Sequence, residues 1–547
     1  MADGAAFDAI IVGAGFAGIY QLKALRDIGL SCLVIDQAGD VGGTWYWNLY
    51  PGAMSDTESY VYRYSWDRDD LLSYPFKERY VKQPEVLAYL EHVVERHDLR
   101  KHMRFNTAML SARWDNSTHR WDLTVTGDEQ LSAKYVITGL GLLSKQNYPD
   151  IPGLDSFAGE MHHTAKWPKN LPLEGKRAGV IGCGSTGVQV ITDIGRKVKS
   201  LTCFQRHPQY SVPSGDKKVT PEYRRWANEN WDQIFAHVRN SITAFGFKES
   251  EISFHDVGPE ERDRIFEDNW QKGNGFRFMF GTFNDIATDA EANKAACAFI
   301  RGKIDQIVKD PEKARKLKPY DVYARRPLCD GNASNGEKYF EQFNRDNVDV
   351  VDLKETPIER LEPQGVRTSD GKLHELDVLI FATGFDAVEG NYTRIAIHGR
   401  NGLSLKDAWE ESGPTSYLGI CVPDFPNLFM ITGPKGPFTN IPPAIEVQVE
   451  FIAEAIAQAE KARAPLIEAT HEAERGYSAL CEQLAANSLF WKAEDNWIFG
   501  ANIPGKKRCL RFFFGGMQAY CGKLAECAKN GYTGFKPFAR DLTSARL

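Results

Sequence analysis

Two glycine-rich segments of this 547-residue chain have the residue types and the spacing that bind the pyrophosphate of a dinucleotide. The first occupies residues 13–18 and reads G-A-G-F-A-G, between the apolar run at 8–12 and a helical stretch at 19–30. Glycines at this spacing permit a tight turn and a close approach of the backbone to phosphate, and the N-terminus of the helix then faces the anion. The expected contact residues are Gly13, Gly15, Phe16, Ala17 and Gly18.

The second segment occupies residues 182–187 and reads G-C-G-S-T-G, after an apolar strand predicted at 177–181 and before a helix that begins at Val188. A nucleophile elbow is excluded here, because Cys183 stands where the G-x-S-x-G pattern requires glycine. The segment therefore predicts a second nucleotide site. The expected contact residues are Gly182, Gly184, Ser185, Thr186, Gly187 and Gln189.

The two predicted sites differ where the next strand of each unit ends. The strand at 31–35 ends at Asp36, whereas the strand at 200–204 ends at Gln205 and Arg206. An acid accepts hydrogen bonds from a ribose but repels a 2′-phosphate, which an arginine can pair with. We therefore expect FAD at the first site and NADPH, rather than NADH, at the second. A redox sensor that binds NADPH without consuming it remains an alternative.

The composition limits the other function classes. The net charge of −7 argues against a nucleic-acid partner, and no run of 18 apolar residues predicts a membrane span. The ten cysteines include no C-x-x-C pair, which argues against a disulfide reductase and a zinc knuckle, and we expect no metal site. The N-terminal residues resemble neither a signal nor a transit peptide. We expect a cytoplasmic protein; the sequence does not give the oligomeric state, and a monomer is our expectation.

Residues 157–168 lie between the two units and match the pattern F-x-G-x-x-x-H-x-x-x-W-P. Their periodicity is that of neither a helix nor a strand, so on composition alone they are an aromatic linker. The pattern resembles the fingerprint of flavin-dependent Baeyer–Villiger monooxygenases. In this chain the matching residues, to which the resemblance gives a positioning role, are Phe157, Gly159, His163, Trp167 and Pro168.

The resemblance covers nearly the whole chain, and it is greatest to the cyclohexanone monooxygenase branch. The segments that carry it are 64–67, 209–213, 326–330, 381–386 and 497–506. It implies that FAD, NADPH and O2 are used, and that a flavin C4a-peroxide inserts one oxygen atom beside the carbonyl of a cyclic ketone to give a lactone. A flavin monooxygenase that oxygenates nitrogen or sulfur is the alternative. Its relatives share both glycine-rich loops but lack the W-P ending and the Arg326 segment.

The same resemblance assigns roles that the residue types alone leave open. It implies that Arg326 is catalytic, that Asp56 lies near the reacting edge of the flavin and holds Arg326, and that Arg325 contacts the coenzyme. Without it, the arginine pair could be surface charge and Asp56 an ordinary turn residue. The remaining cofactor contacts that it implies are Gly43, Thr44, Trp45 and Trp497.

Trp497 belongs to a Gly-containing segment that we expect to act as a mobile lid. Two features depart from the family pattern, a polar insertion at 331–338 that we expect to be a surface bulge, and Lys435, where a neutral residue was expected. The insertion bears on loop mobility, and Lys435 bears on substrate preference. The residues expected to line the substrate pocket are Leu142, Phe278, Phe438 and Phe512.

These residues require two nucleotide-binding units to hold them. We predict an α/β fold with two Rossmann-like domains and a mainly helical insertion in the second. The FAD domain is expected at 1–145 and 386–547, the NADPH domain at 146–214 and 321–385, and the helical insertion at 215–320.

Overall fold

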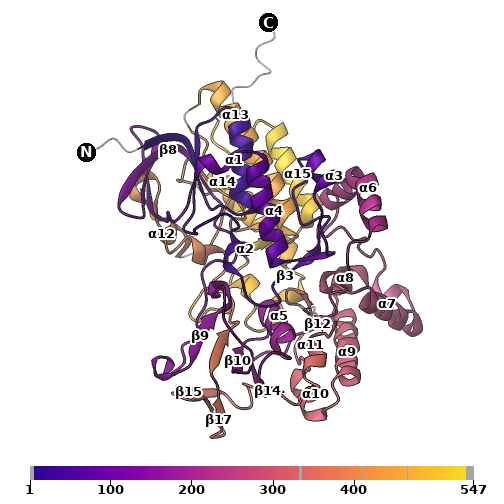
Figure 1. The fold of residues 1–547 in the computed structure, drawn as a ribbon. Coiled ribbons are helices and arrows are strands. Elements are labelled where there is room, and N and C mark those ends of the chain that lie inside the picture. The colour runs from indigo at the N-terminus through magenta and orange to yellow at the C-terminus, as the bar shows by residue number, and fades with distance from the viewer. Residues whose placement is uncertain (1–4, 332–335, 411, 465, 538–547) are drawn as a thin grey trace.

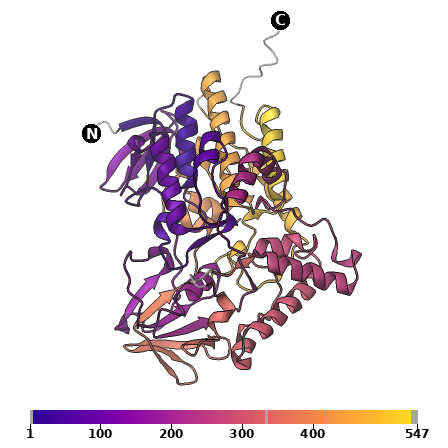
Figure 2. The same ribbon diagram turned by 45° about the vertical axis from the view of Figure 1, so that its right-hand side comes forward.

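The structure, a computed structural model, describes residues 5–331, 336–410, 412–464 and 466–537. Its strands gather mainly into two sheets, each accompanied by helices. In Figure 1 the larger sheet lies in the upper part of the molecule, the smaller one lies in the lower part, and a group of helices lies beside them on the right. The turned view in Figure 2 preserves this arrangement.

The larger sheet has eight strands in the order β19-β6-β7-β8-β1-β2-β5, with β20 also paired to β8. Its strands are β1 (Ala5–Val12), β2 (Cys32–Ile35), β5 (Met103–Arg104), β6 (Met109–Asp115), β7 (Arg120–Val125), β8 (Glu129–Thr138), β19 (Ala396–His398) and β20 (Leu428–Met430). β1 runs parallel to both β2 and β8. A central parallel strand is covered on both faces, which explains the uninterrupted apolar run predicted at 8–12.

The two faces of β1 enter different cores. Ile11 packs into the core that contains residues of α1 (Phe16–Asp27) and α13 (Ile441–Ala462), two helices that contact each other. Ile10 packs on the opposite face, with Trp121 of β7. Both isoleucines are fully buried. The loop between β1 and α1 is therefore held by elements buried on either side.

The smaller sheet is entirely parallel, in the order β14-β11-β10-β18-β9. Its strands are β9 (Glu160–His163), β10 (Arg177–Ile181), β11 (Ser200–Gln205), β14 (Val348–Asp352) and β18 (Val378–Phe381). The predicted strand at 177–181 coincides with β10, and α5 (Ser185–Ile194) follows it. The prediction of an α/β fold with two Rossmann-like units and helical content is confirmed.

The expectation that residues 157–168 have no strand is wrong. Residues 160–163 form β9, an edge strand that pairs parallel to β18 with His163 opposite Phe381. The strand is only four residues long and polar, because an edge strand is covered on fewer sides than a central one. Pairing with β18, more than 200 positions later, supplies the structure that local periodicity could not indicate.

Residues 215–320 are mainly helical and form the group on the right in Figure 1. Their helices are α6 (Pro221–Arg239), α7 (Pro259–Lys272), α8 (Gly275–Gly281), α9 (Ala290–Ile307) and α10 (Pro311–Leu317). α9 and α10 follow each other closely but are separate helices. Asp310 caps a new helix by accepting hydrogen bonds from Glu312 N and Lys313 N, and Pro311 occupies its first turn.

Shorter elements connect these parts, and β15, β16 and β17 form a separate antiparallel sheet. The remaining helices and strands are α2 (Thr44–Trp47), β3 (Met54–Glu58), α3 (Arg68–Ser73), β4 (Tyr80–Lys82), α4 (Gln83–Arg96), β12 (Ser211–Val212), β13 (Leu328–Cys329), α11 (Tyr339–Gln342), β15 (Ile358–Glu362), β16 (Gly365–Thr368), β17 (Leu373–Glu375), α12 (Leu405–Glu410), β21 (Gly436–Pro437), α14 (His471–Ala485), β22 (Phe512–Phe513) and α15 (Gly516–Lys529). Among the described residues, no helix combines the length and apolar character needed to cross a bilayer. The ten cysteines are free thiols.

Candidate active site

A cavity of about 1450 Å³ extends between the carboxyl ends of β1 and β10. Ligands of parallel α/β sheets bind outside the carboxyl ends of the strands, so both glycine-rich loops face a shared space. The predicted contact residues that line it are Gly13, Gly15, Phe16, Ala17, Asp36, Gly43, Thr44, Trp45, Asp56, Gly182, Gly184, Ser185, Thr186, Gln189, Arg206, Arg325, Arg326 and Trp497.

Two of the predicted contact glycines, Gly18 and Gly187, pack a helix against a strand instead of lining the cavity. A Cβ atom on Gly18 would lie 1.7 Å from Gly13 O, and one on Gly187 would lie 2.2 Å from Gly182 O. Each third glycine of the pattern therefore lets its helix start close to the preceding turn. Gly13 itself has a φ of +111°, and a Cβ atom there would lie 2.4 Å from Gly139 O. The turn leaves no room for a side chain.

Asp36, at the end of β2, holds the first loop in shape. Its Oδ2 accepts a hydrogen bond from Ala14 N at 2.6 Å, and its Oδ1 accepts one from Ala38 N at 2.8 Å. Burial raises the pKa of this carboxyl group, and the two amides oppose the shift. A carboxylate has about four acceptor positions, so Asp36 retains capacity for a ribose hydroxyl.

Gln189, on α5 beside the second loop, forms hydrogen bonds to the segment that precedes Asp56. Its Oε1 accepts a hydrogen bond from the hydroxyl of Tyr50 at 2.8 Å, and its Nε2 donates to Met54 O at 3.1 Å. The side chain is 2% exposed. Its polar atoms are thus committed to protein contacts, and it positions the segment before Asp56.

Arg326 and Asp56 meet at the centre of the lining. Arg326 Nη2 donates to Asp56 Oδ2 at 2.6 Å, and Nη1 donates to Ser185 Oγ at 2.8 Å. The guanidinium group also lies 5.2 Å from the ring centroid of Phe276. Asp56 Oδ1 is buried and has no hydrogen-bond partner among the residues that the structure describes. This arrangement presents a fixed cation and a spare acceptor to any bound molecule.

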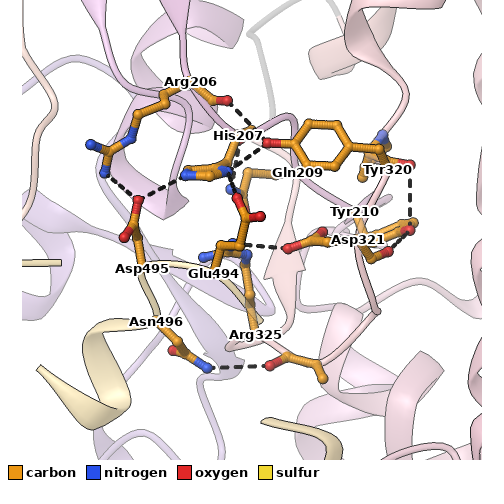
Figure 3. Close-up of polar contacts among 12 residues, drawn as sticks. Arg206, His207, Gln209, Tyr210, Tyr320, Asp321, Arg325, Glu494, Asp495 and Asn496 are labelled. Carbon is orange, nitrogen blue, oxygen red and sulfur yellow. Dashed lines mark hydrogen bonds and ion pairs between the residues drawn. The ribbon is translucent and has the colours of Figure 1, made fainter. Parts of the chain in front are cut away.

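Arg206 and Arg325 place further positive charge on the cavity that the second loop also lines, and Figure 3 shows their polar contacts. Arg206 is 59% exposed, and its Nη2 lies 3.0 Å from Asp495 Oδ2. Arg325 Nη2 donates to Asp321 Oδ2 at 2.9 Å, while its Nε is buried without a hydrogen-bond partner in the described part of the chain. Both arginines line the cavity and retain donors for an anion.

The segment that carries Trp497 closes part of the cavity and is fixed at both ends. Trp497 stands edge-on to Phe512, with ring centroids 5.7 Å apart. Asn502 Nδ2 donates to Phe385 O at 2.9 Å, and Lys506 forms ion pairs with Asp386 and Glu389. These contacts order the segment beside the cavity, and its mobility as a lid stays a prediction.

The apolar wall agrees with the sequence prediction except at one phenylalanine. Leu142, Phe438 and Phe512 line the cavity, but the prediction for Phe278 is wrong. Phe278 is fully buried in the helical region and stacks on Phe266 and Phe299. α8 had not been predicted as a helix, so the face on which each phenylalanine lies could not be assigned.

Phe276, two positions earlier on α8, lines the cavity in place of Phe278. Its ring stacks on that of Phe245 at a centroid distance of 4.1 Å, and Phe245 lines the cavity too. No sequence pattern pointed to Phe245. Together these rings cover the side of the cavity next to Arg326.

The 157–168 stretch supports the cavity from behind. Of its residues, Ala165 and Lys166 reach the lining. Phe157 and Trp167 are 7% and 8% exposed and pack into cores, and a Cβ atom on Gly159 would lie 2.5 Å from the Phe157 ring. His163 is 1% exposed, and its Nδ1 accepts a hydrogen bond from Ala165 N at 3.1 Å. This contact fixes the turn that brings Ala165 to the cavity.

Burial lowers the pKa of His163 to about 4. The backbone carbonyl groups of Gly384 and Asn147 lie near its ring and oppose the shift, without reaching hydrogen-bond geometry at Nε2. The imidazole is therefore neutral at neutral pH, which suits a structural role. Pro168 follows at the end of this stretch and is half-buried.

Of the two departures from the family pattern, Lys435 lies apart from the cavity wall, and part of the 331–338 insertion lies outside the residues that the structure describes. Lys435 is 3% exposed, and its Nζ lies 2.8 Å from Glu482 Oε1 on α14. The side chain points to this helix, which removes the reason to connect it directly with substrate preference. Residues 332–335 of the predicted 331–338 bulge lie outside the described residues, so that prediction stays untested.

Comparisons with known proteins agree with this geometry. A family model described as flavin-binding monooxygenase-like matches residues 7–212. The chain is 49% identical over 545 residues to a Baeyer–Villiger monooxygenase of Pseudooceanicola batsensis, covering 100% of this chain and 98% of that protein. It is 50% identical over 530 residues to the phenazine N-monooxygenase PhzNO1 of Lysobacter antibioticus, covering 97% and 96%. A crystal structure of cyclohexanone monooxygenase from Rhodococcus sp. Phi1 bound to NADP+ matches with a TM-score of 0.95 at 51% identity, covering 98% of this chain and 100% of that chain.

Proposed function

This chain belongs to the flavin-binding Baeyer–Villiger monooxygenases, and from that premise we propose that it oxidises a cyclic ketone to a lactone. NADPH is the reductant, O2 is the oxidant and FAD is the flavin. The ketone, O2, NADPH and a proton yield the lactone, NADP+ and water. The observation that carries the proposal is the Arg326–Asp56 pair on a cavity that both nucleotide loops share.

The residues of the first loop fit FAD. Gly13, Gly15 and Gly43 leave a cradle without side chains, in which a Cβ atom on Gly15 would lie 3.3 Å from Gly43 Cα. Asp36 offers spare acceptor capacity at the end of β2 for the adenosine ribose. The unpaired Oδ1 of Asp56 is an acceptor for a donor group near the reacting edge of the ring.

The residues of the second loop fit NADPH. Ser185 and Thr186 begin α5, where the N-terminus of the helix favours a pyrophosphate. Arg206 and Arg325 have donors available for the additional phosphate. The fit therefore extends to the pyrophosphate, which NADH also carries, and to the 2′-phosphate, which distinguishes NADPH from NADH.

When bound, NADPH would supply the hydride and FAD would supply the site at which O2 is activated. Arg326 remains charged at any working pH and lies where it can stabilise negative charge that develops on the ketone oxygen. Asp56 holds this guanidinium group in place. Phe245, Phe276 and Phe438 exclude water from the same side of the cavity, which protects reactive intermediates.

The division into domains is part of the proposal. The FAD domain comprises 1–145 and 386–547, the NADPH domain comprises 146–214 and 321–385, and the helical insertion comprises 215–320. The positions of the two sheets and of helices α6–α10 support these ranges. We also propose a monomer that acts on small molecules in the cytoplasm without a nucleic-acid or membrane partner, in keeping with its net charge of −7.

Oxygenation of a ring nitrogen is a second candidate reaction, because the chain is 50% identical to a phenazine N-monooxygenase. The two reactions need the same cofactors but differ in the atom that receives oxygen. The aromatic wall that includes Phe245 and Phe276 could hold a flat heteroaromatic ring as well as a cyclic ketone.

A substrate panel decides between the two reactions. The purified enzyme is supplied with NADPH and either cyclic ketones, linear ketones or phenazines, and both NADPH consumption and products are measured. Lactone formation coupled to NADPH consumption is expected. N-oxide without lactone would favour the second candidate, and NADPH consumption that yields hydrogen peroxide with every substrate would contradict both.

A further inference from the structure

Asp495 brings a carboxylate from the segment that carries Trp497 to the place where Arg206 faces the cavity (Figure 3). Its Oδ2 lies 3.0 Å from Arg206 Nη2 and 3.0 Å from His207 Nε2. No sequence pattern pointed to this residue, which lies almost 290 positions after Arg206. The carboxylate of Asp495 therefore already pairs with the Arg206 guanidinium group, which is expected to bind the 2′-phosphate.

The surroundings of Asp495 favour negative charge. Burial acts in the opposite direction, but His207, Arg206 and Arg325 together lower the pKa of this carboxyl group below its usual range. Asp495 is thus ionised at neutral pH. The position attracts anions in general, and a phosphate bound nearby would carry a charge of about −1.5 to −2 at neutral pH.

Asp495 is also prevented from moving far while the segment is closed. The next residue, Asn496, is 1% exposed, and its Nδ2 donates to Ala324 O at 3.3 Å and to Phe490 O at 3.1 Å. Asn496 Oδ1 accepts a hydrogen bond from Ile498 N. Arg206, in contrast, is 59% exposed and can turn toward a phosphate. The carboxylate would then remain beside the phosphate with the hydrogen bond to His207 but without the guanidinium group of Arg206.

We propose that Asp495 limits the preference of this site for NADPH over NADH. This inference rests on the proposed use of NADPH. When a 2′-phosphate binds, Asp495 loses Arg206 and repels the incoming negative charge. When the ribose carries a free 2′-hydroxyl instead, the same carboxylate can accept its hydrogen bond, as acidic residues do in NAD sites. Asp495 is a specificity-determining residue that opposes Arg206.

The test measures binding to the FAD-loaded enzyme by calorimetry with two probes, adenosine 2′,5′-bisphosphate and adenosine 5′-monophosphate. The variant Asp495→Asn removes the charge and keeps the size and an acceptor oxygen. We expect it to bind the bisphosphate about 3- to 10-fold more tightly, because a partly exposed charge contact with a doubly charged group is lost. Affinity for the monophosphate should stay the same or fall. The KM for NADPH should fall correspondingly, whereas that for NADH should not.

Glu494→Gln is the matched control. Glu494 is the adjacent carboxylate, is 56% exposed, and pairs with Lys354 Nζ at 2.7 Å instead of Arg206. Glu494→Gln changes the net charge by the same amount as Asp495→Asn. The ratio of the affinities for the bisphosphate and the monophosphate should nevertheless change less, because Glu494 does not pair with Arg206. An equal change in both variants would mean that net charge, and not the position of Asp495, causes the effect.

Two further outcomes would overturn the inference. Equal weakening of both probes in Asp495→Asn would show that Asp495 only holds the closed segment. Selective weakening of the bisphosphate would show that Asp495 orients Arg206 for the phosphate. If the unaltered enzyme does not prefer the bisphosphate over the monophosphate, the proposed use of NADPH itself is contradicted. That result is distinguishable from a failure of the role of Asp495, which concerns only the variant.

Discussion

Arg326 and Asp56, which lie 270 positions apart in the chain, form an ion pair with 2.6 Å between Nη2 and Oδ2. β3 supplies the aspartate, whereas the arginine lies just before β13. Their side chains are 28% and 5% exposed, so the aspartate is the buried member and the arginine faces the cavity. The arrangement suits an arginine that acts on substrate and an aspartate that positions it.

Asp56→Asn should lower the oxygenation rate about 10-fold and leave the bound FAD in place. An amide can still accept a hydrogen bond from Arg326, but a neutral bond is weaker than a charge-assisted one by about 1–2 kcal/mol. Steady-state kinetics with cyclohexanone, together with measurement of hydrogen peroxide, checks this. An unchanged rate would remove Asp56 from the positioning role.

Arg206→Ala should abolish most of the preference for NADPH, which we expect to be at least ~10-fold in kcat/KM, or about 1.4 kcal/mol. The KM for NADPH should rise and kinetics with NADH should change little, because NADH has no 2′-phosphate for Arg206 to bind. The comparison uses both coenzymes at a fixed ketone concentration. Equal losses with the two coenzymes would show that Arg206 does not bind the 2′-phosphate.

Gly13→Ala should yield protein with most of its FAD missing. The Cβ atom would lie 2.4 Å from Gly139 O, and the φ of +111° costs a non-glycine residue about 1–3 kcal/mol. The flavin content after purification is read from the absorbance spectrum. Gly302→Ala is the control, since Gly302 lies in α9 with no neighbouring atom within 4 Å of an added Cβ. Normal flavin content in Gly13→Ala would contradict the close fit of this turn.

The variant His163→Asn should lose less folding stability than the unaltered protein when the pH falls. The pKa of His163 is about 4 in the folded protein, below its value of about 6.5 in an unfolded chain. Since the unfolded state binds the proton more tightly, this residue's contribution is present above about pH 6.5 and is lost as the pH falls toward 4. The full contribution is on the order of 3 kcal/mol.

Urea denaturation at about pH 7.5 and about pH 5 measures this effect as the difference between the two midpoints. The midpoint of the unaltered protein should fall more than that of His163→Asn. His162→Asn provides the comparison, since His162 is more exposed and adjacent in the chain. A midpoint that falls equally in His163→Asn and the unaltered protein would contradict the buried, neutral state of His163.

The sequence predicted the parts of the site that depend on local patterns. β10 coincides with the strand predicted at 177–181, and helices α6–α10 lie within the range predicted for the helical insertion, 215–320. Both have a periodicity and flanking signals that a single segment contains. The confirmed membership of the monooxygenase family likewise followed from short motifs at fixed spacing.

What the sequence did not predict depends on contacts between distant segments. β9 forms only because β18 pairs with it, and Asp495 reaches Arg206 only because the C-terminal part of the chain returns to the residue that follows β11. The choice between Phe276 and Phe278 depends on how α8 is rotated against its neighbours. Periodicity carries no information about any of these relationships.

The central claim is that Arg326 acts in the oxygenation step, and single-turnover kinetics of Arg326→Ala tests it most directly. Chemically reduced enzyme is mixed with O2, NADP+ and cyclohexanone, and the lactone is quantified. Arg325→Ala is the matched control at saturating NADP+, because it removes the adjacent guanidinium group, which pairs with Asp321 instead. We expect Arg326→Ala to retain FAD and to form lactone roughly 10²–10³-fold more slowly. Lactone formation at a rate near that of the unaltered enzyme would contradict the account.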